Sequence, residues 1–451
     1  MSDKLSRRNF VKCAGAAAGA AGLAGCAGSS GGGGGLESGE RPIKWLAPAW
    51  AARSEQVTHF EDATGLSLNV TNANNATTQQ KVFTGAAETF DAVSHDTVLG
   101  PAFTVDQDKT DSIATEDVER WSDENVADVF TNFEETFSHL GGQTEKMGTF
   151  LWEDSDTQEE LRHPPHVFNF NGVGLNPKYI DKSNTHRYSA LFDDQYEGQV
   201  AMGSVPSITM NEVMGHLKDT DRVDARVGQL NNPTEDQIDV AVDYLVKQKE
   251  SGQFRSTWTA YGQSVNLMSS EEAIIGDLWQ PAVLDVRRAG TPCNYATMSE
   301  GVQGYQYWWG GVIPLKPGAS ERNNLNEVTS LYNMHLGAWF PGFIQNWGYP
   351  TANYPNKELV RDGEDETGQG MGPEYYDWAY EGKATYDAID EPALFDPMSY
   401  EWSMEEGSPS SEGSVRDQGS IEERINRTSH FQIWPDNSEY LLERWKDFET
   451  A

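Results

Sequence analysis

The chain has 451 residues, and its 70 Asp and Glu against 33 Lys and Arg give a formal net charge of −37. A surface this acidic repels nucleic acid, so a nucleic-acid-binding function is excluded. The 14 Trp, 17 Tyr and 18 Phe can form packed cores, which excludes a disordered acidic chain, and the length allows two domains. The acidic residues are spread along the whole chain, as in proteins of salt-loving organisms, where ions screen self-repulsion. An alternative explanation, compatible with the first, is that the acidic residues attract a cationic ligand.

The N-terminal residues predict export and lipidation. "SRRNFVK" (6–12) resembles the twin-arginine (Tat) export consensus, and "LAGC" (23–26) resembles a lipobox. That likeness implies that residues 1–25 are a signal, that Cys26 is lipidated, and that residues 26–41 form a Gly-rich flexible tether. No later apolar run approaches membrane length. We therefore expect a soluble body held by lipid at the extracellular face of the cell membrane, without a disulfide, because Cys293 is the last cysteine left.

The first part of the body predicts an α/β lobe. Strand and helix patterns alternate over 43–47, 54–63, 66–70, 79–86 and 90–93. Strand, helix, strand, helix and strand in this order indicate a parallel sheet covered by helices.

The rest of the chain continues this mixture of strands and helices. Residues 106–160 are acidic and predicted to be rich in loops, and a new strand begins at 167–170 after the Pro pair of His163-Pro-Pro-His166. Further elements are predicted at 234–249 (helix), 283–289 (helix), 305–314 (strand), 323–336 (helix) and 437–448 (helix).

Several stretches together resemble a known family. They are "HFEDATGLSLNV" (59–70), "FDAVSHDT" (90–97), "IIGDLWQPAVLDVRRAG" (274–290), and "WWGGVIPLKPGASERNNLNEV" (308–328) with "NWGYPTANY" (346–354). In order and spacing they resemble the extracellular solute-binding lipoproteins of ABC importers, in the spermidine/putrescine-binding branch and in a halophilic archaeal form. The resemblance implies an α/β, two-lobed, type II periplasmic-binding-protein-like fold, hinged around a central ligand cleft. Lobe 1 would hold residues 42–164 and 311–355, lobe 2 residues 165–310, and a C-terminal extension, 356–451, would pack on the lobes.

The resemblance also implies ligand-binding residues. They are the pocket tryptophan Trp279, Tyr349 of a Gly-Tyr-Pro-Thr loop, Trp50 of an aromatic wall, Asp96 after the third strand, and Glu212 as the carboxylate of the second lobe. Purely structural roles remain as alternatives for three of them: Trp279 and Tyr349 as core aromatics, and Asp96 as a helix N-cap. For the aromatic wall, Trp45 is an alternative to Trp50.

The return strand departs from the family pattern. Where the family has an aspartate two residues after an aromatic, this chain has Tyr307 and Trp309, and Thr209 replaces a second acid. An aromatic face returns only about 0.5–2 kcal/mol to a buried cation, and an ammonium normally needs a carboxylate as well. A pocket with many aromatics and few acids suits one ammonium, a diffuse quaternary amine or a neutral aromatic solute.

The prediction is therefore a monomeric receptor that passes a small organic solute, with an amine or polyamine-like cation favoured, to an ABC permease, without cofactor or metal. An exported hydrolase is the main alternative, but its candidate pairs Glu271-Glu272 and Glu153-Asp154 are adjacent residues that point apart, whereas glycosidase carboxylates face each other about 5–10 Å apart. The segment from His163 to His166 is extended by its prolines and no third metal ligand is evident. A sugar receptor of a related ABC system would also use tryptophan walls.

Overall fold

The computed structural model describes residues 41–98, 109–180, 187–316, 324–365, 368–384, 414–415 and 419–451. The predicted signal, Cys26 and the tether up to residue 40 lie outside the described residues. Within the described ranges, no helix is both long and apolar enough to cross a bilayer.

Lobe 1 is built around a four-stranded sheet in the order β12-β3-β1-β2. Its strands are β1 (Ile43–Ala47), β2 (Leu68–Asn72), β3 (Ala92–Val93) and β12 (Ile313–Pro314). β1 runs parallel to β2 and β3, as the alternation of strands and helices predicts, and β12 returns antiparallel to β3. The helices of this lobe are α2 (Ser54–Thr64), α3 (Asn75–Phe83) and α11 (Leu325–His335).

Helix α3 begins four residues before the predicted start at residue 79. The cause is a side-chain cap: Asn74 accepts a hydrogen bond from the backbone N–H of Thr77, which satisfies one of the free donors of the first turn. The apolar period of the helix does not extend into this polar first turn, so the sequence pattern alone missed it.

Lobe 2 is built around a larger sheet in the order β15-β11-β6-β9-β7-β8, with β10 paired to β6. Its strands are β6 (Pro165–Leu175), β7 (Val200–Gly203), β8 (Phe254–Trp258), β9 (Ile275–Trp279), β10 (Asn294–Tyr295), β11 (Tyr305–Gly311) and β15 (Thr428–Phe431). Its helices include α7 (Pro206–Asp219), α8 (Glu235–Glu250), α9 (Tyr261–Ser269) and α10 (Gln280–Arg288). α8 corresponds to the helix predicted at 234–249, and the structure shows a capping box at its start, in which the side chains of Thr234 and Gln237 accept each other's backbone N–H.

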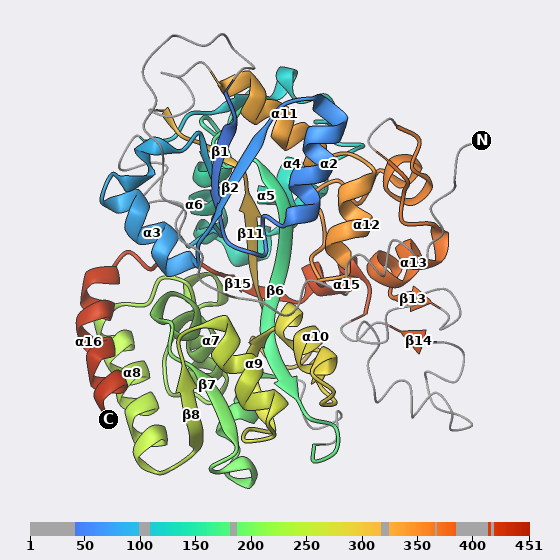
Figure 1. Ribbon diagram of the computed structural model, residues 1–451. Coiled ribbons are helices and arrows are strands. Elements are labelled where there is room, and N and C mark those ends of the chain that lie inside the picture. Colours follow the sequence, from blue (N-terminus) through green and yellow to red (C-terminus); the bar gives the residue numbers. More distant parts are fainter. Residues whose placement is uncertain are drawn as a thin grey trace, which may run out of the picture.

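Two antiparallel strands, β6 and β11, connect the lobes (Figure 1). β6 meets lobe 1 where Val167 bridges to Thr351, and β11 does so where Gly310 bridges to Asp96, just before the chain enters β12. Residues from both lobes therefore approach each other along these strands.

The region predicted to be rich in loops contains short helices: α4 (Asp128–Thr131), α5 (Phe133–Thr136) and α6 (Gly142–Leu151). They bury Phe130, Phe133 and Phe137 in the main core, against the β6–β11 pair. α4 and α5 have only four residues each, too few for a helical period to be recognised in the sequence.

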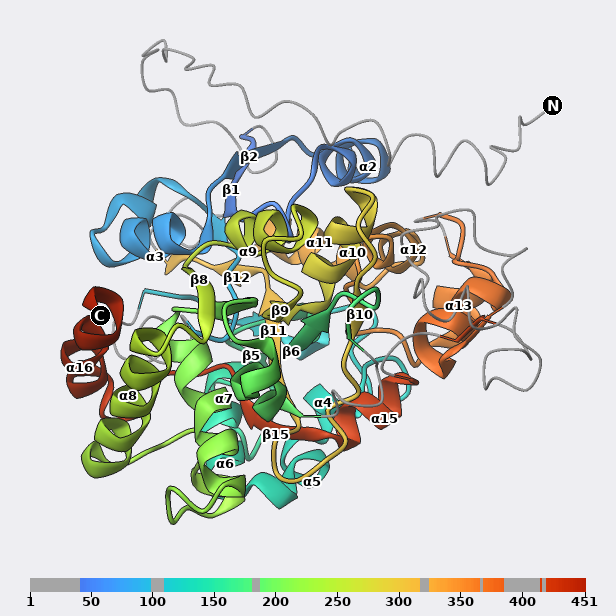
Figure 2. The ribbon, with the colours of Figure 1, turned by 90° about the horizontal axis from the view of Figure 1, so that it is seen from below.

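Within the described ranges, segments of the last hundred residues are part of the folded body. They contribute α13 (Pro373–Glu381), α15 (Ile421–Asn426), β15 and α16 (Ser438–Thr450), besides the short pair β13 (Lys383–Ala384) and β14 (Ser414–Val415). β15 pairs in parallel with β11, and α16 lies along α8 on lobe 2 (Figure 2). The C-terminal segment thus supplies an edge strand to the sheet that joins the lobes.

Candidate functional site

Aromatic side chains from both lobes meet beside the connecting strands. Trp50 follows β1, Tyr349 follows α12 (Trp339–Gln345), Trp308 lies on β11, and Trp279 ends β9 in lobe 2. We call Trp50, Trp279, Trp308 and Tyr349 the interlobe aromatic cluster. Ring centroids are 5.8 Å apart for Trp50 and Trp308, 6.5 Å for Trp50 and Tyr349, and 6.2 Å for Trp308 and Tyr349. Trp279 packs on this group while also contacting Trp258 at 4.9 Å inside lobe 2.

Three of the residues predicted from the resemblance, Trp50, Trp279 and Tyr349, are thus brought together. Trp308 is the member that sequence reasoning missed. Its neighbours Tyr307 and Trp309, both predicted to bind ligand, are fully buried on the opposite face of β11, among Phe133, Phe137 and Phe168.

Trp308 faces the cluster and its neighbours Tyr307 and Trp309 face the core because of the geometry of the strand. Successive side chains of a strand point to opposite faces, so Trp308 and its two neighbours cannot share one face. Strand alternation places Trp308 on one face of β11 and Tyr307 and Trp309 on the other. Trp308 is the one that faces Trp50.

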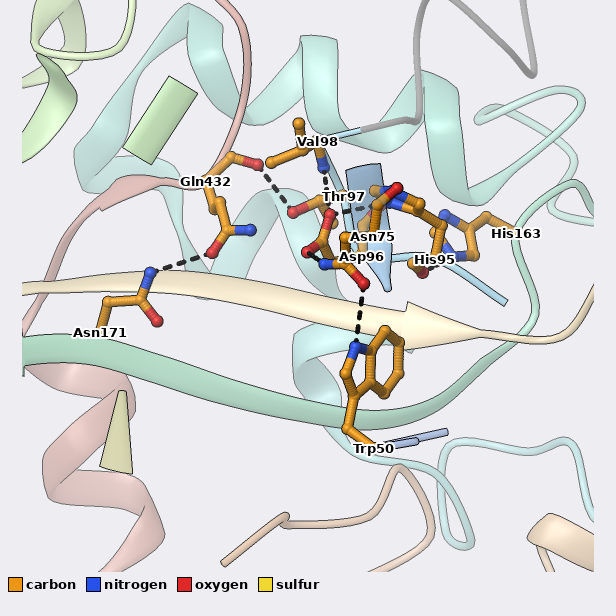
Figure 3. Close-up of polar contacts among 9 residues, drawn as sticks. All are labelled: Trp50, Asn75, His95, Asp96, Thr97, Val98, His163, Asn171 and Gln432. Carbon is orange, nitrogen blue, oxygen red and sulfur yellow. Dashed lines mark hydrogen bonds and ion pairs between the residues drawn. The ribbon is translucent and has the colours of Figure 1, made fainter. Parts of the chain in front are cut away.

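Asp96 lies in the loop that follows β3, in a chain of hydrogen bonds that ends on Trp50 (Figure 3). Asn75 Nδ2 donates to Asp96 Oδ2 over 2.6 Å, and Trp50 Nε1 donates to Asn75 Oδ1 over 3.2 Å. Asp96 Oδ1 accepts the backbone N–H of Val98 and lies 2.9 Å from His95 Nδ1. Asp96 is 6% exposed. Its carboxylate therefore sets the position of Trp50 through Asn75.

His95 compensates the charge of Asp96. Burial opposes protonation of His95, but the charge and hydrogen bonds of Asp96 outweigh it, so the pKa of His95 is raised. The neighbouring His163, whose Nε2 lies 3.2 Å from the His95 carbonyl oxygen, has its pKa lowered to about 3 by burial and by the charge of His95.

Trp308 is held by a second polar network. Its Nε1 donates to Asn171 Oδ1 over 2.9 Å, and Asn171 Nδ2 donates to Gln306 and Gln432 over 2.8 and 2.9 Å. Thr97, next to Asp96, donates to the backbone oxygen of Gln432 over 2.7 Å. Both networks therefore join the β3 loop, the connecting strands and the C-terminal segment around one aromatic group.

Glu212 lies elsewhere, in the interior of lobe 2. It is 2% exposed and packs against Asp277 and Tyr188, whose hydroxyl donates to Asp277 over 3.2 Å. Burial raises the pKa of both carboxyls, and the repulsion of Asp277 raises that of Glu212 further. A role for Glu212 in holding this buried pair explains its contacts better than direct contact with a ligand between the lobes.

Glu212→Gln is expected to reduce the loss of stability between pH 5 and pH 8. A carboxyl whose pKa is raised in the folded state contributes stability at low pH that is lost as the pH rises through the folded value. The amide keeps the shape and removes that loss, so the free energy of unfolding at pH 8, from urea denaturation, should rise relative to that at pH 5. Glu271→Gln, at a partly exposed carboxyl whose pKa is lowered by its hydrogen bond to Lys178, is the matched control. An unchanged difference between pH 5 and pH 8 in Glu212→Gln would contradict the interpretation of the pair.

Among the described residues, no three His, Cys, Asp or Glu side chains are grouped as a metal site would need. In particular, His163 and His166 are both buried among aromatic rings, where they contact Trp309 and Trp50 respectively.

Comparison with known proteins depends on structure alone, since no protein-family model and no curated protein matches this chain. A solved spermidine/putrescine ABC transporter protein from Listeria monocytogenes superposes with a TM-score of 0.58 at 13% identity, over 90% of this chain and 98% of that one. The chain has the fold of a type II periplasmic binding protein.

Two further solved structures with this fold align with a similar share of this chain. The spermidine/putrescine ABC transporter substrate-binding protein of Streptococcus pneumoniae gives a TM-score of 0.56 at 13% identity, over 91% of this chain and 98% of that one. A periplasmic binding protein of A. tumefaciens in complex with agropinic acid gives 0.51 at 13% identity, over 91% and 99%.

Proposed function

We propose that this chain is the extracellular receptor of an ABC importer, that it binds a small organic amine between its lobes, and that it releases the amine chemically unchanged to the permease. The observation that carries the proposal is the interlobe aromatic cluster, because its members come from both lobes and from a connecting strand. A solute held there would be enclosed when the lobes close.

The chemistry of the cluster favours a diffuse cation. Each aromatic face contributes about 0.5–2 kcal/mol to a cation, and Asp96 adds a carboxylate close to Trp50. Because His95 already balances much of the Asp96 charge, one amine is accommodated more readily than the two ends of a polyamine.

The cellular location belongs to the same proposal. We infer that residues 1–25 direct twin-arginine export, that Cys26 carries lipid, and that the Gly-rich segment tethers the lobes beside the permease. The acidic surface would keep the exported body soluble in high salt.

The test is a solute panel of primary amines, polyamines, betaine-like cations, sugars and aromatic acids. Binding to the native state alone stabilises it, so the melting temperature should rise with the amines, and small-angle scattering should show the particle becoming more compact. A shift with sugars instead would favour a carbohydrate receptor, and turnover of chromogenic esters or glycosides without any shift would favour a hydrolase.

Trp279→Ala is expected to weaken binding of the amine found in this panel about tenfold, because loss of one cation–π face removes on the order of 1.4 kcal/mol. Isothermal titration measures the change. Trp121→Ala, a half-buried tryptophan that packs on Trp152 away from the cluster, should bind as tightly as the parent protein. Equal affinities of the two variants would remove Trp279 from the site.

A further inference from the structure

Two arginines, one from each lobe, face the same indole ring. Arg53 immediately precedes α2 in lobe 1, and Arg288 ends α10 in lobe 2. Their guanidinium carbons lie 3.6 Å and 4.7 Å from the ring centre of Trp347. Arg288 also donates to the backbone oxygen of Asn346, so the lobes are in direct contact here.

The two guanidiniums differ in their counterions. Arg288 pairs with Asp285 at 3.0 Å, and Asp285 also accepts the hydroxyl of Tyr261 at 2.7 Å. Among the residues that the structure describes, no ion pair joins Arg53 to a carboxylate. Burial lowers the pKa of Arg53, but a guanidinium stays charged under all ordinary conditions. In the described part of the chain, Arg53 therefore has no carboxylate in direct contact, and only the more distant charges of Asp285 and Glu55 act on it.

Two hydrogen-bond donors at this contact also lack an acceptor among the described residues. Within the described ranges, Arg53 Nε and Trp347 Nε1 are both buried and have no acceptor. A buried donor without an acceptor is unfavourable, and here two such donors lie beside a guanidinium that no carboxylate of the described chain contacts directly. An acceptor that carries negative charge would satisfy both donors and the guanidinium together.

This position adjoins the interlobe aromatic cluster. Trp347 packs on the same group of buried side chains as Trp50 and Tyr349, and the Tyr349 hydroxyl is close enough to influence the pKa of Arg53. Arg53 also lines a surface hollow of about 580 Å³, together with Ser54 and Asn72, which leaves this side of the residue open to solvent.

We propose that the solute is a zwitterion of the amino-acid or betaine type, whose carboxylate binds Arg53 Nε and Trp347 Nε1 while its cationic end faces Trp50, Trp308 and Tyr349. This inference depends on the proposed function, because it names the second charged group of the same solute. It also accounts for the scarcity of carboxylates around the cluster, since a zwitterion needs only one cation site.

The test uses pairs of solutes that differ in the carboxylate: 4-aminobutyrate with 1,4-diaminobutane, and glycine betaine with choline. By isothermal titration at constant ionic strength, the carboxylate member of at least one pair should bind tenfold or more tightly than its partner. Arg53→Gln should remove that preference, and Arg53→Lys, which keeps the charge but loses the planar donor set, should retain part of it. Arg255→Gln, at an exposed arginine paired with Glu272 on lobe 2, should leave the preference unchanged.

The outcomes separate this inference from the proposed function. Equal or tighter binding of the diamine and of choline would overturn the carboxylate site and leave the amine receptor intact. An unaltered preference in Arg53→Gln would also overturn the site. Absence of binding by all four solutes and by every other amine would overturn the receptor proposal itself. Should Arg53→Gln fail to fold, Arg53→Lys decides the question, because full retention of the preference would again contradict a role for Arg53 Nε.

Discussion

The free energy of unfolding is expected to fall by several kcal/mol when the pH is lowered from 7 to 5. The cause is a set of histidines that are buried in neutral form. Burial lowers the pKa to about 3 for His163, His216, His335 and His430, and lowers that of His166 well below its usual value.

The sign follows from proton linkage. In the unfolded chain each histidine binds a proton below a pH of about 6.5, whereas these folded ones do not, so their contribution to stability is lost as the pH falls below that value. The raised pKa values of Glu212 and Asp277 act in the opposite direction, because these carboxyls hold protons in the folded state. Five histidines against at most two protons leave a net uptake on unfolding of about three, or on the order of 4 kcal/mol per pH unit near pH 5.5.

His335 shows why the buried rings resist protonation. Its Nδ1 lies 2.7 Å from the Leu331 carbonyl oxygen and donates to it, while its Nε2 lies 3.2 Å from the amide nitrogen of Gln56 and accepts from it. A proton on Nε2 would turn that acceptor into a second donor facing the Gln56 amide. Burial among Trp45, His166 and Phe340 also keeps water from solvating the charge.

The measurement is urea denaturation at half-unit steps of pH at constant ionic strength. His335→Gln should reduce the slope of unfolding free energy against pH by about one proton, or roughly 1.4 kcal/mol per pH unit. His139→Gln, at an exposed ring bonded to the Thr428 backbone, is the control and should keep the slope. A slope that is the same in both variants would mean that His335 does not contribute to acid sensitivity.

The sequence indicated most of the framework of this fold because its signals are local. The alternation through residue 93 predicts the parallel part of the lobe 1 sheet, and the apolar period over residues 234–249 predicts α8. By contrast, β15 is only four residues long and takes its place through pairing with β11, more than a hundred residues earlier in the chain. No local period reveals such a partner.

The candidate site was predictable in part for the same reason. Trp279 and Tyr349 stand in stretches whose order resembles a family, Trp50 is assigned to the aromatic wall that the resemblance implies, and the three come together. The polar residues that hold the cluster, Asn171 and Gln432, are joined only by the fold, since they lie on β6 and just after β15. Arg53 was also missed. An arginine near the start of a helix is normally a solvent-exposed residue, and only the structure shows that its Nε is buried without an acceptor among the described residues.

Trp309→Ala is expected to lower the free energy of unfolding by about 3–5 kcal/mol, as removal of a fully buried tryptophan generally does, while leaving the affinity of the folded protein for its solute unchanged. The ring packs against Phe130 at 6.1 Å, Phe133 at 5.8 Å and His163 at 5.7 Å, all on the core side of β11. Urea denaturation measures the loss of stability and isothermal titration the affinity.

The neighbouring Trp308 should respond in the opposite way. Trp308→Phe keeps a ring but removes the Nε1 donor to Asn171, which leaves the Asn171 oxygen without this bond and the ring free to turn away from Trp50. We expect solute binding to weaken several-fold in Trp308→Phe and to stay unchanged in Trp309→Phe, which also serves if Trp309→Ala does not fold. If Trp309→Phe weakens binding as much as Trp308→Phe, both faces of β11 contribute to recognition. In that case the alternation of side chains along this strand does not divide the core from the site.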